Sequence, residues 1–353
     1  LGAELVLGGH PDQAFREVDL IVVSPGVPPL AVLDEAEADG TPVISEVELA
    51  ARFIDAPIVA VTGTNGKSTV TTLVGEMCRT LSRPVFVGGN LGQPMIEAVD
   101  SHAGSEAGLV IVELSSFQLE RVAEMTAHVA ILLNISPDHL DRYPSFDAYA
   151  AAKGRIFERQ QAEDFAVVPS DAPQLRELAD GGGTVLLFGG RQGEVRVVDD
   201  AIADSETGLR VPLSDLRLRG SHNIANACAA ALAARLVGVH AQDIASVLRS
   251  FEGLAHRMQH VATFGGVEYI DDSKATNVGA AAAALDGLEQ ASGKIVLIAG
   301  GVDKGGSYEP LCRRMAARGR AVVVLGEAAP PVSYTHLTLP TMSTTWWAGG
   351  GAG

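Results

Sequence analysis

The segment VAVTGTNGKST, from Val59 to Thr69, constrains the fold of this chain more than any other stretch. It predicts an apolar strand, a tight turn and a helix that opens at Lys67. Such a turn directs backbone N–H groups and the positive end of the helix at an anion. Lys67 can reach the β- and γ-phosphates of a nucleotide, and the Ser68 hydroxyl can bind Mg²⁺. We therefore expect a binding site for Mg-ATP, with an ordinary glycine-rich turn as the alternative. The expected residues of the binding site are Gly63, Thr64, Asn65, Gly66, Lys67, Ser68 and Thr69.

Composition narrows the class of protein. With 353 residues, 47% of them hydrophobic, the chain is long enough for two or three α/β domains with full cores. A formal net charge of −17 argues against nucleic acid as a partner, because neutralising phosphates needs clustered Lys and Arg. The three cysteines are far apart and form no C-x-x-C, which favours a reduced cytoplasm over disulfides or zinc. No apolar run approaches the roughly 20 residues of a membrane span, so a membrane is not expected as a partner either.

The order of apolar segments predicts an α/β fold with three domains. Residues 1–55 resemble part of a small α/β unit, with a strand at Leu20–Val23. Residues 56–256 predict a mostly parallel, doubly wound central sheet, followed by a polar section, Glu194–Leu218, that favours antiparallel strands. Residues 257–330 predict part of a Rossmann-like domain. The expected central strands are Ile58–Val61, Pro84–Val87, Leu109–Glu113, Val129–Asn134 and Phe165–Val168, and those of the last domain are Val267–Ile270, Lys294–Ala299 and Ala321–Leu325.

Both ends of the sequence are unusual. The chain starts with Leu1 in what reads as the middle of a domain, so we expect the N-terminal domain to be incomplete. After about Pro330 the composition becomes Thr-rich and then ends in Trp-Trp and glycines, without helical or strand periodicity. The run VSYTHL within it is similar to one reading frame of a sequencing adapter. We therefore expect residues 331–353 to be a non-native tail that leaves the last domain incomplete too.

Polar side chains follow two of the predicted central strands. Glu113 ends one strand, and the loop NISPDHLDRY after the next presents Asn134, Asp138, His139, Asp141 and Arg142. In open α/β sheets, ligands bind outside the carboxyl ends of the strands. We therefore expect Glu113 to face the metal, and His139 to lie at the same edge of the sheet.

A second group of candidate residues lies further along the chain. GSHNIAN places Asn223 and Asn226 on one face of a helix, where they can hold a nucleotide; capping of the helix by Ser221 is the alternative. Arg257 falls at the expected boundary between two domains, where it can clamp a phosphate. Lys274 and Lys304 follow strands of the last domain and suit a substrate that carries carboxylates.

Nine motifs in a consistent order resemble the Mur ligase family. They are SPGVP, GTNGKST, GGNLG, ELSSFQLE, SPDHLDRY, AAKGRIF, GSHNIAN, HRMQ and DDSKATN, and they cover residues 20–325. The resemblance implies a three-domain ATP-dependent ligase, and the motifs are most similar to members that join D-glutamate to UDP-N-acetylmuramoyl-L-alanine. Folate polyglutamate synthases share the compact loop and remain the rival. A nucleotide-binding module without catalysis is a third possibility.

The resemblance also assigns roles to individual residues. It implies that Ser68 and Glu113 hold one Mg²⁺, and that His139 holds a second Mg²⁺ together with an N-carboxylated Lys153. From the residues alone, Lys153 would be a surface cation on a helix. The nucleotide contacts implied are Asn223, Asn226, Arg257 and Asp272; the contacts to UDP-N-acetylmuramoyl-L-alanine are Ser24, Gly26, Asn90, Gln118 and His139; those to D-glutamate are Lys274, Thr276 and Lys304.

The reaction implied by the resemblance is amide formation through an acyl phosphate, in peptidoglycan precursor synthesis. The γ-phosphate of ATP activates the L-alanine carboxylate, and the amine of D-glutamate then displaces phosphate. We expect a bacterial, cytoplasmic monomer, and we expect the 353-residue chain itself to be inactive or weakly active because both outer domains read as incomplete.

Overall fold

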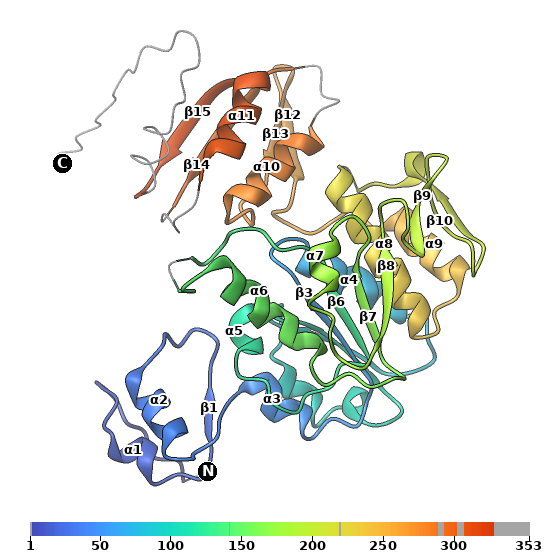
Figure 1. Ribbon diagram of the computed structural model, residues 1–353. Coiled ribbons are helices and arrows are strands. Elements are labelled where there is room, and N and C mark those ends of the chain that lie inside the picture. The colour runs from blue at the N-terminus through green and yellow to red at the C-terminus, as the bar shows by residue number, and fades with distance from the viewer. Residues whose placement is uncertain (1, 141, 219, 289–292, 302–306, 328–353) are drawn as a thin grey trace, which may run out of the picture. The chain divides into compact units, whose positions relative to one another are not determined.

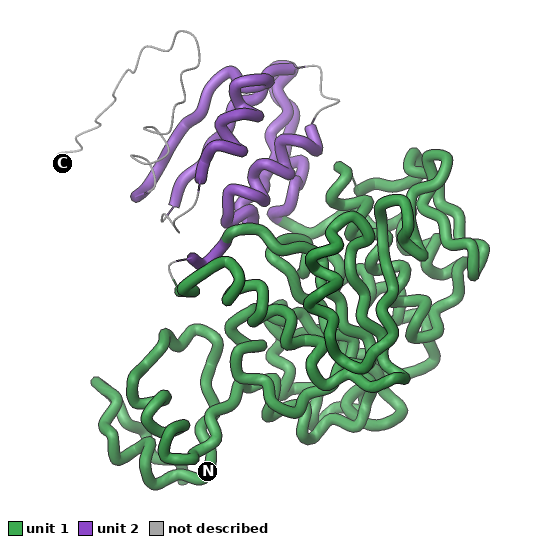
Figure 2. The backbone as a smooth tube through the Cα atoms, viewed as in Figure 1, with its two compact units in different colours: residues 1–137, 142–255 green, residues 138–141, 256–353 purple. Residues whose placement is uncertain are grey.

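The computed structural model describes residues 2–140, 142–218, 220–288, 293–301 and 307–327. The chain forms two compact units, which Figure 2 distinguishes by colour. The first comprises residues 1–137 and 142–255, and the second comprises residues 138–141 and 256–353. No helix within the described ranges is long and apolar enough to cross a membrane. The expected tail, residues 331–353, lies outside the described residues.

The first unit begins with a small α/β layer around a few buried aliphatic residues. Its core consists of Leu33, Ala36 and Val43. Two short parallel strands, β1 and β2, pair with each other, and the Ser45 hydroxyl caps the helix that leads to the central sheet. The elements are α1 (Gln13–Arg16), β1 (Ile21–Val23), α2 (Ala31–Ala38), β2 (Val43–Ser45) and α3 (Glu46–Ala51).

A nine-stranded sheet forms the centre of the first unit, in the order β11-β10-β9-β8-β7-β6-β3-β5-β4 (Figure 1). Neighbouring strands from β4 to β9 are parallel, whereas β9, β10 and β11 are antiparallel, as the polar section 194–218 predicted. Strand β8 was not expected. The bounds are β3 (Ile58–Thr62), β4 (Val85–Gly89), β5 (Leu109–Glu113), β6 (Val129–Leu132), β7 (Phe165–Pro169), β8 (Thr184–Phe188), β9 (Val195–Val198), β10 (Ala201–Asp204) and β11 (Leu209–Pro212).

Helices cover both faces of this sheet, so the doubly wound prediction is confirmed. Successive residues of β3 alternate between two cores, because side chains of a strand point to opposite faces: Val59 and Val61 belong to one core, and Ile58 and Ala60 to the other. The first core includes residues of α4 (Lys67–Cys78), α8 (Ser221–Leu236) and α9 (Ala241–Ser250). The second includes residues of α3, α5 (Ser116–Leu119), η1 (Met95–Ala98), η3 (Arg155–Phe157) and α7 (Pro173–Arg176).

The second unit confirms the expected order of strands and helices but not one shared sheet. The hairpin β12–β13 is antiparallel and β14–β15 is parallel, and within the described part of this unit the two pairs form separate sheets. Leu285, Leu311 and Met315 form its buried core between α10 and α11. Strand β12 was not expected. The bounds are β12 (Gln259–Phe264), β13 (Val267–Asp271), α10 (Val278–Gly287), β14 (Ile295–Gly300), α11 (Glu309–Arg318) and β15 (Gly319–Leu325).

The three free thiols should react at very different rates. Cys78 and Cys228 are buried in the same core, and burial raises the pKa of each to about 12. Cys312 is partly exposed, although burial also raises its pKa. Because the thiolate is the reactive form, we expect a thiol reagent at pH 8 to modify only Cys312 in the folded protein, and all three cysteines in denaturant. A Cys312→Ser variant should lose the native reaction; equal rates for three thiols in the folded protein would contradict the buried placement.

Candidate nucleotide-binding site

The glycine-rich loop lies at the point where the strand order of the central sheet reverses. Strand β3 sits between β5 and β6, and the chain leaves β3 toward β4 and β5 before it crosses back to β6. Crevices outside the carboxyl ends of strands at such a point are where open α/β sheets bind ligands. The loop from Gly63 to Gly66 connects the end of β3 directly to the N-terminus of α4.

Both glycines of the loop are required by backbone conformation and by close packing. Gly66 has φ +88°, and a Cβ there would lie 2.4 Å from the Asn226 side-chain oxygen. Gly63 has φ +149°, and its Cβ would lie 3.1 Å from that of Leu133. These φ values strain residues with a side chain. The loop is thus held between the end of β6 and the first turns of α8.

Two lysine ammonium groups converge on one carbonyl of the loop. Lys67 Nζ donates to the Gly63 oxygen at 3.1 Å and to the Thr64 oxygen at 3.0 Å. Lys153 Nζ, from the end of α6 (Phe146–Gly154), donates to the same Gly63 oxygen at 2.9 Å. Lys153 is only 2% exposed, and its ammonium lies 4.8 Å from the centre of the Tyr149 ring. The prediction of a surface cation, made from the residues alone, is therefore wrong, because the Lys153 side chain points from α6 toward the loop.

Glu113 has the features of a metal ligand. It ends β5, paired in register with Val61 of β3, and is 3% exposed. Its Oε1 accepts a hydrogen bond from Asn90 Nδ2 at 2.8 Å, whereas its buried Oε2 has no hydrogen-bond partner within the described part of the chain. A buried carboxylate oxygen without a partner is costly unless a cation or donor meets it.

The donor set around the loop suits Mg²⁺. This ion prefers oxygen ligands and uses only one or two carboxylates when phosphates and water supply the rest. Among the described residues there is no group of three His, Cys, Asp or Glu side chains that could hold a metal by themselves. The Glu113 carboxylate and the hydroxyl of Ser68, the second residue of α4, are the kinds of ligand that suit a magnesium ion that arrives with a nucleotide.

Asn134 and Tyr149 hold the loop from the β6 side, and neither was among the predicted site residues. Asn134 is bonded to the backbone of Thr64 and Asn65, and the Tyr149 hydroxyl lies 3.0 Å from Thr64 Oγ1. The Thr64 hydroxyl also accepts from the Ser136 N–H at 3.0 Å. These contacts join segments about 70 or more positions apart in the chain, with separations of 69, 72 and 85 residues, so no local signal in the sequence reveals them.

Helix α8 brings the predicted asparagines to the loop. Asn226 is buried against Gly66, and its Nδ2 lies 3.5 Å from Asn223 Oδ1. Gly220, not Ser221, is the N-cap of the helix, so capping by Ser221 is wrong. The alanine-rich part of the helix is buried in the core, as that alternative expected.

The loop after Ser136 contributes His139 to the second unit. His139 adopts a left-handed backbone with φ +54°, and its N–H donates to Asp138 Oδ1 at 3.0 Å. The other carboxylate oxygen of Asp138 accepts from Asn277, the N-cap residue of α10, at 3.0 Å. His139 is therefore described together with the residues of the second unit, and its predicted role as a metal ligand stays a prediction.

The remaining predicted residues of the second unit surround the start of β12 and the end of β13. Asp272 accepts from the Met258 N–H at 3.0 Å, and burial raises the pKa of its carboxyl group. His256 and Met258, on either side of Arg257, have positive φ values of 63° and 48°. Lys274 and Thr276 are exposed. Lys304 lies outside the described residues.

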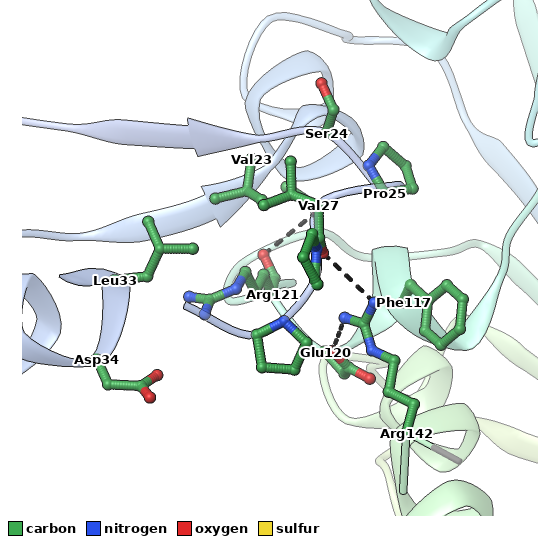
Figure 3. A pocket seen from close by; sticks show the side chains of 13 residues that line it. Val23, Ser24, Pro25, Val27, Leu33, Asp34, Phe117, Glu120, Arg121 and Arg142 are labelled. Carbon is green, nitrogen blue, oxygen red and sulfur yellow. Dashed lines mark hydrogen bonds and ion pairs between the residues drawn. The ribbon is translucent and has the colours of Figure 1, made fainter. Parts of the chain in front are cut away.

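A pocket of about 100 Å³ lies between the SPGVP segment and α5 of the first unit (Figure 3). Ser24 lines it, whereas Gly26 does not. Arg142 contributes a cation: its guanidinium stacks 3.9 Å from the Phe117 ring centre and pairs with Glu120 at 3.0 Å. The pocket thus combines apolar walls with a fixed guanidinium, a combination that suits an anionic ligand with an apolar part.

Gln118 is committed to a structural contact. Its side-chain oxygen accepts from the N–H and the hydroxyl of Ser115, each at 2.9 Å, which completes a capping box at the start of α5. The side chain is 2% exposed. Its predicted contact with the substrate therefore stays a prediction that this geometry does not strengthen, whereas Asn90 is exposed beside Glu113.

Two domains of the chain match one family of proteins. Residues 61–234 match the Mur ligase middle domain, and residues 256–338 match the Mur ligase glutamate ligase domain. The UDP-N-acetylmuramoylalanine–D-glutamate ligase of Desulfosudis oleivorans is 45% identical over 338 residues, which are 93% of this chain and 72% of that protein. The enzyme of the same name from Pelotomaculum thermopropionicum is 42% identical over 93% of this chain and 73% of its own length.

Solved structures share the fold at lower identity. The MurF ligase of Thermotoga maritima in complex with ADP superposes with a TM-score of 0.63 at 19% identity, covering 91% of this chain and 84% of that one. MurF of Acinetobacter baumannii gives a TM-score of 0.66 at 21% identity, covering 91% and 81%. The fold, the loop and the matches over most of the length agree with one another, and the chain belongs to the Mur ligase family.

Proposed function

We propose that the protein joins D-glutamate to UDP-N-acetylmuramoyl-L-alanine at the expense of ATP. Relatives that are 41–45% identical over most of the chain carry the name of this ligase. The observation that carries the proposal is the site itself: an oxygen of Glu113 that is buried and has no hydrogen-bond partner among the described residues, and a glycine loop whose carbonyl groups bind Lys67. Such an arrangement serves an enzyme that binds a metal-held triphosphate.

The chemistry requires activation of a poor electrophile. A carboxylate resists attack by an amine, so the γ-phosphate is first transferred to the L-alanine carboxylate of the substrate. The amine of D-glutamate then attacks the acyl carbon. The bond between that carbon and the phosphate oxygen breaks, phosphate leaves, and the nitrogen loses a proton to give the amide. Lys67 offsets the negative charge of the transferred γ-phosphate, and the N-terminus of α4 orients the other phosphates of ATP. Mg²⁺, when bound, supplies further charge neutralisation at the phosphates.

We assign the magnesium-binding roles as follows. Glu113 and Ser68 hold the first Mg²⁺, and Asn90 fixes the orientation of Glu113 through its hydrogen bond. We assign His139 and an N-carboxylated Lys153 to a second Mg²⁺. Carboxylation would turn the buried ammonium of Lys153 into an anion that keeps one N–H, which can still donate to the Gly63 oxygen.

The partners of the reaction are small molecules. We assign Ser24, with the pocket around Arg142, to the UDP-sugar substrate, and Lys274 and Thr276 to the carboxylates of D-glutamate. Arg257, Asp272, Asn223 and Asn226 are assigned to the nucleotide. We further propose that the protein acts as a monomer in the bacterial cytoplasm, where ATP is available and where its free thiols stay reduced.

Release of ADP tests this function. The protein should release ADP only when Mg²⁺, UDP-N-acetylmuramoyl-L-alanine and D-glutamate are all present, and L-glutamate should not replace D-glutamate. A Lys67→Ala variant sets the background, so that even a slow rate is measurable. ADP release that responds to a folate and glutamate instead would favour a folate polyglutamate synthase. Because only a weak rate is expected of the 353-residue chain, the result that would contradict the function is a rate equal to that of Lys67→Ala together with equal Mg-ATP affinity in the two proteins.

A further inference from the structure

Asn134 is the residue that fixes the middle of the phosphate-binding loop. Its Oδ1 accepts from the backbone N–H of Asn65 at 2.9 Å, and its Nδ2 donates to the carbonyl of the same residue at 2.9 Å. Its own carbonyl accepts from the Thr64 N–H, also at 2.9 Å. Three hydrogen bonds thus join Asn134, which follows β6, to three consecutive peptide groups of the loop, those between residues 63 and 66.

The two side-chain bonds work as a pair. Asn65 is the residue before Gly66, and its N–H and carbonyl both point to the Asn134 amide. A side-chain amide offers one acceptor and two donors, so it can satisfy both groups of a residue at once, as a neighbouring strand does. The orientation of the peptide groups on either side of Asn65 is therefore set by a side chain that lies outside the loop.

Other contacts hold the residues of the loop that precede Asn65. Gly63 packs so closely on Leu133 and Asn134 that a Cβ would come within 3.1 and 3.3 Å of them. Lys67 binds the carbonyl groups of Gly63 and Thr64. The bonds to Asn134 act on the next residue, Asn65, and the glycine that follows it permits other backbone conformations, so loss of these bonds should loosen the central peptide groups of the loop.

We propose that Asn134 is a positioning residue for the triphosphate: it pre-orients the peptide groups of residues 64–66 and so sets the affinity for Mg-ATP. The inference rests on the proposed ATP-dependent function. Because binding to a pre-oriented loop avoids the cost of ordering it, loss of the two bonds should appear in nucleotide affinity. The same loss should leave the KM for D-glutamate unchanged.

Two variants separate the hydrogen bonds from the charge at this position. Asn134→Ala removes both side-chain bonds, and we expect the Kd of Mg-ATP, measured by calorimetric titration, to rise about tenfold. Asn134→Asp keeps the acceptor for the Asn65 N–H but loses the donor and adds a negative charge, and we expect a rise of about a hundredfold at pH 8. Protonation restores a donor, and an ordinary Asp carboxyl has a pKa of about 4, so the deficit of Asn134→Asp relative to the unsubstituted protein at the same pH should shrink as the pH falls from 8 toward 4.

Ser136→Ala is the matched control in the same segment. The Ser136 hydroxyl is buried and has no hydrogen-bond partner among the described residues, and the hydrogen bonds between Ser136 and the loop come from its backbone. The ATP affinity of the Ser136→Ala variant should therefore stay within about twofold of that of the unsubstituted protein. Thermal unfolding of each variant shows whether the fold is intact. If Asn134→Ala does not fold, the pH dependence of Asn134→Asp carries the test.

The outcomes distinguish this inference from the proposed function. Unchanged Mg-ATP affinity in both Asn134 variants, with loss of affinity in Lys67→Ala, would overturn the role of Asn134 and leave the function standing. A pH-independent deficit in Asn134→Asp, or an equal loss of affinity for ATP and for the UDP-sugar, would also overturn it. Equal ATP affinity in Lys67→Ala and the unsubstituted protein would instead count against the proposed function.

Discussion

Replacing Lys67 by alanine is expected to reduce the weak ADP release expected of this chain to background and to weaken Mg-ATP binding by at least about tenfold. Lys67 is the first residue of α4, and its ammonium lies over the loop carbonyl groups of Gly63 and Thr64. From there it can reach the β- and γ-phosphates, and its charge matters most when the γ-phosphate is being transferred. Turnover should therefore fall further than affinity.

Two further variants make this result specific. Lys294→Ala removes an exposed lysine next to β14 and should change neither quantity. Lys67→Arg keeps the positive charge but replaces a compact ammonium by a planar fork, so it should restore little of the activity. Full activity in Lys67→Ala, with an unchanged melting temperature, would show that the loop does not serve the triphosphate.

Replacing Glu48 by alanine is expected to cost about 3–5 kcal/mol of unfolding free energy. Glu48 is 0% exposed on α3, and its Oε2 accepts from the backbone N–H groups of Ala123, Glu124 and Met125 at 3.0, 3.1 and 3.0 Å. Its Oε1 also accepts from Arg52 at 3.2 Å. Removal of the carboxylate leaves these donors of the segment before β6 without their acceptor.

Glu46→Ala is the control for Glu48, and denaturant unfolding is the measurement. Glu46 lies one position before Val47 on the same helix, is more exposed and accepts one backbone N–H, from Ile96, so its loss should cost no more than about 1 kcal/mol. Equal destabilisation by the two substitutions would contradict the assigned role of Glu48.

The stabilisation by Glu48 should also depend on pH. Burial by itself would raise the pKa of Glu48, but the hydrogen bonds from Ala123, Glu124, Met125 and Arg52 outweigh it and lower the pKa below 4.5. A carboxyl group whose pKa is lower in the folded state stabilises the protein above its unfolded pKa and loses that effect as the pH falls. The stability difference between the unsubstituted protein and Glu48→Gln should therefore shrink below about pH 4.5.

Patterns that are local in the chain could be predicted, because local chemistry determines them. The glycine spacing predicted the turn between β3 and α4, and apolar runs predicted nine strands within one or two residues of their bounds in the structure. Two local signals were overlooked. Gly265–Gly266 between alternating segments is a hairpin signal that would have revealed β12, and Ser115 three residues before Gln118 is a capping box.

Other features depend on contacts between distant parts of the chain. The burial of Lys153 follows from the packing of α6 against the loop, 90 positions away in the sequence. Composition gives no sign of it, because lysine on a helix is usually exposed. The role of Asn134 likewise depends on peptide groups 69 positions away, and its side chain has the same chemistry as that of any solvated asparagine.

The dependence of ATP affinity on Mg²⁺, in the unsubstituted protein and in Glu113→Gln, tests the central claim most directly. The Gln variant keeps the size of the side chain and an acceptor for Asn90, but it loses the negative charge at the buried oxygen that has no hydrogen-bond partner. We expect Mg²⁺ to strengthen ATP binding to the unsubstituted protein by at least about tenfold and to have little effect on Glu113→Gln. Equal strengthening by Mg²⁺ in both proteins would contradict the assignment of Glu113 as the ligand of the metal that accompanies ATP.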